Sequence, residues 1–351
     1  MPKLAQWLFY LFAAATLFAC GKDSPTTPTP PPPPPPVIDT SFAKGADVSW
    51  ITEMEAAGVK FYSANGTQTE GMALMKSLGI NTIRLRVWVN PASPGWNNTA
   101  DVVAKAVRAK NLGMKLLINF HYSDSWADPG KQTKPAAWAA LSFTNLKAAL
   151  ENHTTEVLNA LKAAGVSPEW VQVGNETNDG LLWPDGRAST NMNNYAQLIT
   201  AGYDAVKAVF ANAKVMVHVS NGWDNGLFRW NIGGLVGAGA KFDMIGMSLY
   251  PQFVAAGWAT ANQQCLTNMN DMATLYNKEV MVVEVGMPWD DAANCKAFIA
   301  DLITKTKSVT GKKGKGVMYW EPQCYGGWKG YTLGAFDNSG KPTVAMDAFK
   351  N

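Results

Sequence analysis

Two hydrophobic periods alternate along most of the chain. From residue 42 onward, short runs rich in β-branched residues are followed by Ala-, Lys- and Leu-rich stretches with helical spacing, a pattern typical of repeated strand–helix units. The runs predict eight strands, at residues 45–49, 81–89, 114–121, 169–176, 214–220, 243–250, 279–285 and 316–320. Helices are predicted between them, for example at residues 68–79, 100–112, 143–164, 192–211 and 293–308.

Each predicted strand ends near a polar or aromatic residue, and these residues recur at intervals of 32 to 55 positions. They are Asp47, Arg86, His121, Glu176, His218, Tyr250, Glu284 and Trp320. Eight such units predict an α/β fold of the (β/α)8 TIM-barrel type, with residues 42–351 as a single catalytic domain. A doubly wound sheet would carry a glycine-rich turn after its first strand, whereas the sequence ITEMEAAG found there has none.

The amino terminus begins with an apolar run at residues 4–19, preceded by Lys3. It is shorter than the roughly 20 residues of a membrane-spanning helix and favours a secretory signal peptide at residues 1–19. It ends in Leu17-Phe18-Ala19-Cys20-Gly21, which resembles a bacterial lipobox and predicts lipidation of Cys20. The alternatives are a short uncleaved anchor and an ordinary secretory signal with an incidental cysteine.

A proline-rich segment follows, because residues 25–36 hold 9 of the 20 prolines. Such a run adopts polyproline II and makes a semi-rigid spacer roughly 37 Å long, so residues 20–41 are predicted to be a linker; a ligand for another domain is the alternative. Lys22-Asp23 is similar to the sorting signals of some Gram-negative lipoproteins. We therefore expect an outer-membrane lipoprotein of the cell envelope, surface-exposed and attached to the membrane only by its lipid.

Composition narrows the class of partner. The net charge is +3 with no block of one sign, which excludes the basic face typical of nucleic-acid binding. The 47% hydrophobic content at near-neutral mean hydropathy excludes a polytopic membrane protein and a disordered chain. Low charge, at 16%, together with 14 tryptophans fits a site for a neutral sugar polymer. Nothing in the sequence requires an oligomer, so a monomer is expected.

Two carboxylates stand out among the strand ends. Glu176 lies in Val173-Gly174-Asn175-Glu176, and Glu284 is the lone acid of Val282-Val283-Glu284-Val285-Gly286. The fourth and seventh strands of a barrel place these residues across its mouth from each other. A separation of about 5–5.5 Å would suit retaining glycoside hydrolysis and about 6.5–9.5 Å inversion. Mutual repulsion would raise the pKa of one carboxyl and keep a proton available for acid catalysis.

Strand parity adds further candidates, since side chains two apart share a face. Arg84, Arg86 and Trp88 therefore point the same way, as do Asn119 and His121. Arginines are poor material for a barrel interior, so they indicate either a polar site or structural ion pairs.

These features together resemble a known family. An Asn-Glu pair on the fourth strand with a Glu on the seventh is similar to clan A glycoside hydrolases. More specifically, the chain resembles glycoside hydrolase family 53, the endo-β-1,4-galactanases, over residues 42–350. The matching stretches are KGADVS at 44–49, NTIRLRVWVNP at 81–91, HYSDSWADPG at 121–130, VGNE at 173–176 and Tyr250-Pro251.

The resemblance implies a (β/α)8 barrel that hydrolyses β-1,4-galactan, as in the type I arabinogalactan side chains of pectin, with retention. Glu176 would be the acid/base and Glu284 the nucleophile. Asn175 would contact the C2 hydroxyl of the sugar, and Tyr250 and Arg86 would contact the nucleophile. His121 and Asp47 would bind sugar hydroxyls, and Trp320 would form the floor of the site under the sugar. The remaining tryptophans would be sugar-stacking platforms or loop packing: Trp88, Trp126, Trp183 and Trp223. The alternatives are another clan A endo-glycosidase acting on mannan or xylan, and a non-catalytic glycan-binding lipoprotein.

The family also includes calcium-binding members, but residues 287–295 after Glu284 form a short loop with only two adjacent acids. Such a loop lacks the alternating oxygen ligands of a calcium site, so neither calcium nor any other metal or cofactor is expected. With Cys20 assigned to lipid, Cys295 and Cys324 are candidates for a disulfide in an oxidising compartment, and Cys265 is expected to be a buried free thiol.

Overall fold

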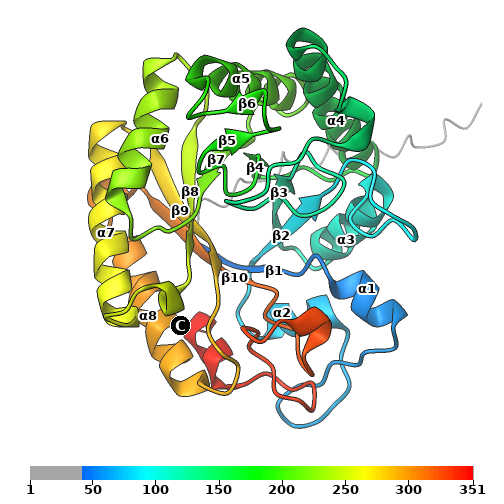
Figure 1. The fold of residues 1–351 in the computed structure, drawn as a ribbon. Helices are drawn as coiled ribbons and strands as arrows, with labels where there is room; N and C mark the ends of the chain where they lie inside the picture. The colour runs from blue at the N-terminus through cyan, green and yellow to red at the C-terminus, as the bar shows by residue number, and fades with distance from the viewer. Residues whose placement is uncertain (1–41, 351) are drawn as a thin grey trace, which may run out of the picture. The chain divides into compact units, whose positions relative to one another are not determined.

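The computed structural model describes residues 42–350, and these form a closed barrel of parallel strands (Figure 1). The strands are β1 (Ala43–Asp47), β2 (Thr82–Val87), β3 (Lys115–Phe120), β4 (Trp170–Val173), β7 (Lys214–Val219), β8 (Met244–Leu249), β9 (Glu279–Val285) and β10 (Gly314–Trp320). Their order around the barrel is β1-β10-β9-β8-β7-β4-β3-β2. Each coincides with a predicted strand to within a few residues, so the predicted TIM barrel is confirmed.

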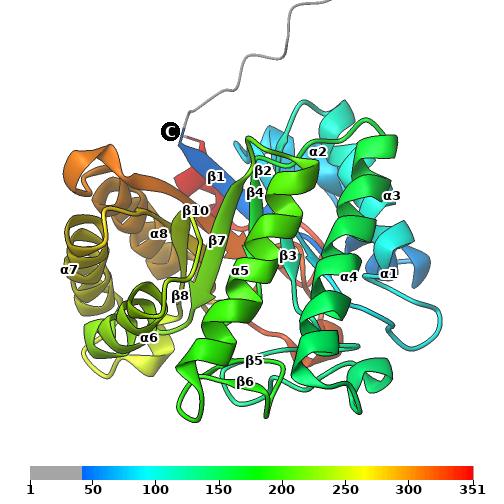
Figure 2. The same ribbon diagram turned by 90° about the horizontal axis from the view of Figure 1, so that it is seen from above.

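Helices surround this barrel (Figures 1 and 2). They are α1 (Ile51–Ala56), α2 (Gly71–Ser77), α3 (Thr99–Asn111), α4 (Phe143–Ala163), α5 (Met192–Val209), α6 (Asn225–Gly237), α7 (Trp258–Leu275) and α8 (Ala292–Lys307). Short 3-10 turns add η1 (Ala136–Trp138), η2 (Pro251–Phe253), η3 (Thr310–Lys312), η4 (Trp328–Gly330) and η5 (Val344–Phe349). Helices α2, α3, α4, α5 and α8 coincide with the predicted examples, whereas α1, α6 and α7 lie outside them. The four glycines of α6 weaken its helical pattern.

The alternation within each strand divides the core into two regions. Outward-facing residues such as Ile83, Leu85 and Val87 of β2 pack in the main core cluster. A second buried cluster contains Ala43, Leu117, Met216, Met244, Met281, Val283 and Met318. Gly45 makes room there, because a Cβ at this position would lie 2.4 Å from Cγ of Met318.

The polar residues of the barrel lie farther along the same strands. On β2, Arg84 and Arg86 follow Thr82 at alternate positions, and all three are buried. This agrees with the predicted parity. The short hairpin of β5 (Gly180–Leu181) and β6 (Gly186–Arg187) follows β4 and lies at the end of the barrel toward which the strands run (Figure 2). This end of the barrel carries the candidate site.

The cysteines correct one prediction. Cys265, Cys295 and Cys324 are all buried free thiols, as predicted for Cys265 but not for the other two. The sulfur of Cys295 on α8 lies 3.6 Å from the hydroxyl of Tyr319, whereas that of Cys324 lies 3.9 Å from the sulfur of Met54. The predicted Cys295–Cys324 disulfide is wrong in this structure because the two side chains pack against different neighbours.

The predicted signal peptide (residues 1–19), lipidated Cys20 and linker (residues 20–41) all lie outside the described residues. Among residues 42–350, no helix is both long enough and apolar enough to cross a membrane.

Candidate active site

The fourth and seventh strands of the barrel carry the two predicted carboxylates. Glu284 is the penultimate residue of β9, in which the residues from Val280 to Val285 are buried, and it is only 6% exposed. Glu176 follows β4 after a turn at Gly174, which has a φ of 84°. Glu176 itself has a φ of 44°, a left-handed conformation that is uncommon outside glycine and costs backbone energy.

Glu284 is held by two side chains, one from β2 and one from the residue that follows β8. Its Oε1 lies 2.8 Å from Nη2 of Arg84, and its Oε2 accepts a hydrogen bond of 3.3 Å from the hydroxyl of Tyr250. Burial raises the pKa of Glu284, and Arg84 opposes this increase. Burial and the nearby Glu284 raise the pKa of Tyr250 well above its ordinary value, so the phenol stays protonated and can donate.

The arginine that contacts the nucleophile candidate is therefore Arg84, which corrects the expectation for Arg86. The Arg84 guanidinium also lies 2.8 Å from Asp47 and donates to the side-chain oxygens of Gln172 and Asn175 at 3.1 and 2.9 Å. Arg86, one step closer to the end of β2, instead pairs with Glu321 at 2.6 Å. Parity places both arginines on one face but does not indicate how far each reaches around the barrel.

Asp47 also differs from its expected role as a sugar ligand. Its side chain is completely buried, and its oxygens accept from the backbone and hydroxyl of Ser49 and from Arg84. It has no surface to offer a sugar. Asp47 therefore positions Arg84, which in turn holds Glu284.

Glu176 has a different electrostatic environment from Glu284. Burial, followed by repulsion from Glu284, raises its pKa from 4.5 to about 8. The hydroxyl of Ser248 and the charge of Arg84 oppose this increase. Glu176 thus keeps its proton at neutral pH, and the influence of Glu284 on its pKa shows that the two carboxyls face the same space.

Two further predicted residues lie beside Glu176. The side-chain amide of Asn175 donates to the carbonyl of Ala127, and its oxygen accepts from Asn119. The Nδ1 atom of His121 accepts from the backbone N–H of Ala127 at 3.1 Å. Burial, with the charges of Arg86 and Arg84, lowers the pKa of His121 far below its ordinary value, so this ring is neutral.

Three indoles lie around Arg86 and a fourth packs against two of them. We call these four residues, Trp50, Trp88, Trp126 and Trp320, the aromatic cage. The guanidinium carbon of Arg86 lies 4.4, 5.0 and 5.4 Å from the ring centres of Trp126, Trp50 and Trp88. Trp320 packs against Trp50 and Trp126 at centroid distances of 5.1 and 5.9 Å. The structure thus brings together the predicted Trp88, Trp126 and Trp320.

The other two tryptophans lie elsewhere. Trp183 is in the β5–β6 hairpin, where its ring lies 4.7 Å from the guanidinium carbon of Arg187. Trp223 is in the loop after β7 and packs partly against the core. Neither belongs to the aromatic cage.

The sequence analysis missed Trp50 and Glu321 as site residues. Glu321 is completely buried and accepts hydrogen bonds from Arg86, Gln323 and the backbone N–H of Trp50. It directly follows Trp320 at the end of β10, so the argument that identified Glu176, an acid at a strand end, also applies to it. Trp50 carries no such indication, because an isolated tryptophan most often belongs to a core.

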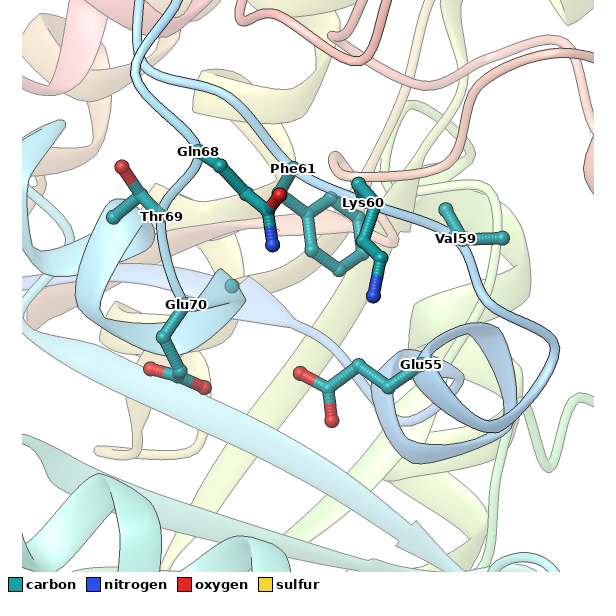
Figure 3. Close-up of a pocket in the computed structure, with 8 residues that line it drawn as sticks. Glu55, Val59, Lys60, Phe61, Gln68, Thr69 and Glu70 are labelled. Atoms are coloured by element: carbon teal, nitrogen blue, oxygen red, sulfur yellow. The ribbon is translucent and has the colours of Figure 1, made fainter.

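A separate cavity of about 260 Å³ lies where the connection from α1 reaches α2 (Figure 3). Glu55 and Glu70 are on its wall, and both form ion pairs with Arg108. None of the predicted site residues lines it. Its carboxylates already have a cationic partner, so this cavity is distinct from the candidate active site.

A (β/α)8 barrel with two interacting carboxyls at the ends of its fourth and seventh strands has the architecture of a glycoside hydrolase. The model of glycosyl hydrolase family 53 matches residues 43–349, and the chain belongs to this family. The protein is therefore an enzyme, which removes the alternative of a non-catalytic glycan-binding lipoprotein.

Several known proteins are similar to this chain. An arabinogalactan endo-β-1,4-galactanase of Thermothelomyces thermophilus is 36% identical over 302 residues, which cover 80% of this chain and 89% of that protein. An uncharacterized protein of Niallia circulans is 34% identical over 336 residues, which cover 87% of this chain and 90% of that protein. A solved fungal β-1,4-galactanase superimposes with a TM-score of 0.81 at 33% identity, covering 88% of this chain and 99% of that one. The family 53 catalytic domain of Ignisphaera aggregans superimposes with a TM-score of 0.80 at 29% identity, and the match covers 91% of this chain and 97% of that one.

Proposed function

We propose that the protein is a retaining endo-β-1,4-galactanase that cleaves β-1,4-galactan by double displacement, with Glu176 as acid/base and Glu284 as nucleophile. The observation that carries this assignment is the contrast between the two carboxyls. Glu284 contacts a guanidinium and a phenol, whereas Glu176 has a pKa raised to about 8. The names of the family 53 relatives support the substrate.

In the first step, a carboxylate oxygen of Glu284 attacks the anomeric carbon of a galactosyl unit. The glycosidic C–O bond breaks, and Glu176 gives its proton to the departing oxygen, so a galactosyl ester remains on Glu284. Arg84 and Tyr250 orient the attacking carboxylate through charge-assisted hydrogen bonds.

In the second step, a water molecule attacks the anomeric carbon while Glu176 takes one of its protons. The ester bond breaks, the Glu284 carboxylate is regenerated, and the sugar leaves with its original anomeric configuration. Esterification removes the negative charge of Glu284, and this lowers the pKa of Glu176 for its second role as a base. The same pair of residues can therefore act first as acid and then as base.

The assignment is tested with Glu176→Gln and Glu284→Ala on β-1,4-galactan. Both variants should lose at least about 10³-fold in kcat. Azide should restore turnover of an activated aryl galactoside in both variants. The product should be the β-galactosyl azide with Glu176→Gln and the α-galactosyl azide with Glu284→Ala. Near-normal activity of either variant on galactan, or release of an inverted product by the wild type, would refute the assignment.

A different β-1,4-linked polymer is the alternative substrate. Reducing-sugar release from galactan, arabinogalactan, mannan and xylan should be highest on galactan by at least tenfold. A comparable or higher rate on mannan or xylan would overturn the substrate assignment without affecting the roles of the two carboxyls.

We also propose that the enzyme is a monomeric lipoprotein of the cell envelope, attached through Cys20 and held away from the membrane by the proline-rich segment. The apolar run and the residues around Cys20 support this proposal. Expression in a Gram-negative host with labelled palmitate should label the wild type but not Cys20→Ser. Protease treatment of intact cells then tests surface exposure, and labelling of the Cys20→Ser chain would contradict the anchor.

A further inference from the structure

We infer that His218 and Ser248 are positioning residues that orient the carboxyl of Glu176 and set its proton affinity. This inference rests on the proposed acid/base role of Glu176. It starts from two completely or almost completely buried polar side chains on β7 and β8, the strands that lie between β4 and β9. Neither side chain is used in the mechanism described above.

The tautomer of His218 follows from its neighbours. Its Nδ1 atom accepts from the backbone N–H of Glu176 at 3.2 Å, and the side-chain amide of Gln172 lies 2.9 Å from the same nitrogen. Oδ1 of Asn175 also lies 3.2 Å from Nδ1, but this oxygen already accepts from Arg84 and Asn119. A backbone N–H can only donate, so Nδ1 carries no proton. Burial and the charges of Arg84 and His121 lower the pKa of His218 far below its ordinary value. The ring is therefore neutral, with its proton on Nε2.

The direction of the next hydrogen bond is then fixed. Nε2 of His218 lies 2.8 Å from the hydroxyl oxygen of Ser248 and donates to it. Since the oxygen of Ser248 accepts from His218, its own proton is directed elsewhere, and the carboxyl of Glu176 is its hydrogen-bonding neighbour. The hydroxyl donor stabilises the ionised form of that carboxyl.

These bonds form a closed ring that begins and ends on one residue. The backbone N–H of Glu176 donates to His218, His218 donates to Ser248, and Ser248 donates to the carboxyl of Glu176. The ring fixes both ends of a residue whose backbone is in the uncommon left-handed region. A carboxyl held in this way loses little rotational freedom when it transfers its proton.

The ring acts together with the charges that face Glu176 from other elements. These are Glu284 on β9, Arg84 on β2 and Asp128 in the loop after β3, with the phenol of Tyr250 after β8. The ring, through Ser248, contributes a neutral donor that distinguishes the ionised from the protonated carboxyl. Removing this donor should therefore change the pH at which Glu176 loses its proton while leaving the charges in place.

The primary test is Ser248→Ala, with kcat/KM on β-1,4-galactan measured between pH 4 and 10. Loss of the donor disfavours the carboxylate, so the alkaline limb should move upward by roughly 0.5–1 pH unit. We also expect kcat to fall about tenfold, with KM nearly unchanged, because the carboxyl is less well oriented. Ser248→Thr keeps a hydroxyl and should keep the wild-type limb.

Thr306→Val is the matched control. Thr306 is also completely buried, and its hydroxyl donates to the carbonyl of Leu302 within α8. This variant should lose thermal stability comparable to that of Ser248→Ala without a change in the alkaline limb. An unshifted limb in Ser248→Ala, or an equal shift in Thr306→Val, would overturn the inference.

Substitutions of His218 test the whole ring of hydrogen bonds rather than the Ser248 hydroxyl alone. His218→Gln retains an amide that can donate to Ser248, whereas His218→Phe does not, so only the latter should move the limb. Because His218 acts on Glu176 through Ser248, the double variant Ser248→Ala/His218→Phe should show the same alkaline limb of the pH profile as Ser248→Ala alone. Additive shifts would refute the ring. If Glu176→Gln retains activity on galactan, the proposed function fails instead, and the two failures are therefore distinguishable.

Discussion

The elevated pKa of Glu176 predicts that this residue lowers the stability of the protein at alkaline pH. The folded protein holds a proton on Glu176 up to about pH 8, whereas the ordinary pKa is 4.5. Between these values the folded state binds more protons than the unfolded chain, so the free energy of unfolding decreases as the pH rises. Replacement of Glu176 by Gln removes this titration and should stabilise the protein above pH 8.

The magnitude follows from the width of this pH window. One group contributes at most about 1.4 kcal/mol for each pH unit, which sets a ceiling of about 5 kcal/mol across the window. Water penetration and relaxation around a partly buried carboxyl reduce this value, so we expect Glu176→Gln to be more stable than the wild type by about 1–3 kcal/mol at pH 8.5. Below pH 4.5 the Glu176 titration should contribute no difference.

Urea denaturation followed by circular dichroism at pH 4.5, 6, 7 and 8.5 measures this difference. Glu55→Gln is the control, because Glu55 is paired with Arg108 in a more exposed setting and such pairs contribute at most about 1 kcal/mol. A stability difference between Glu176→Gln and the wild type that stays constant or decreases with rising pH would refute the argument.

Three other predictions follow from packing and from the site. Gly45→Ala should cost about 1–3 kcal/mol in urea unfolding because its Cβ would overlap Met318, whereas Gly237→Ala in α6, with nothing within 4 Å, should not destabilise the protein. Arg84→Lys should lower kcat about 10²-fold in steady-state assays, because a lysine cannot hold Asp47 and Glu284 together; an unchanged kcat would contradict this role. Trp320→Ala should raise KM for galactan about tenfold while Trp320→Phe raises it less, and equal effects would argue against stacking on this ring.

The fold was predictable because its information is local and repeated. Alternating hydrophobic residues define each strand, and regular spacing between strand ends is enough to indicate a barrel. Helix α6 shows the limit of this approach, since its glycines remove the amphipathic pattern and packing against neighbouring elements must supply the stability instead.

The carboxylates of the site were predictable for a similar reason, because an acid within a buried strand has few structural explanations. The partner of Glu284 was not, since Arg84 and Arg86 share one face and differ only in where their long side chains end. The roles of His218 and Ser248 could not be predicted from the sequence either. They depend on which strands are neighbours in the closed barrel and on the direction of single hydrogen bonds, and neither is encoded in local spacing.

Arg84 has a mechanical consequence in addition to its electrostatic one. Its single guanidinium, based on β2, contacts Asp47 at the end of β1, Gln172 on β4 and Glu284 on β9. It therefore links β2 to β4 and β9, strands with which β2 does not pair, across the mouth of the barrel. The strand ends are expected to move as one body, so that adaptation to different lengths of sugar chain falls to the loops beyond them.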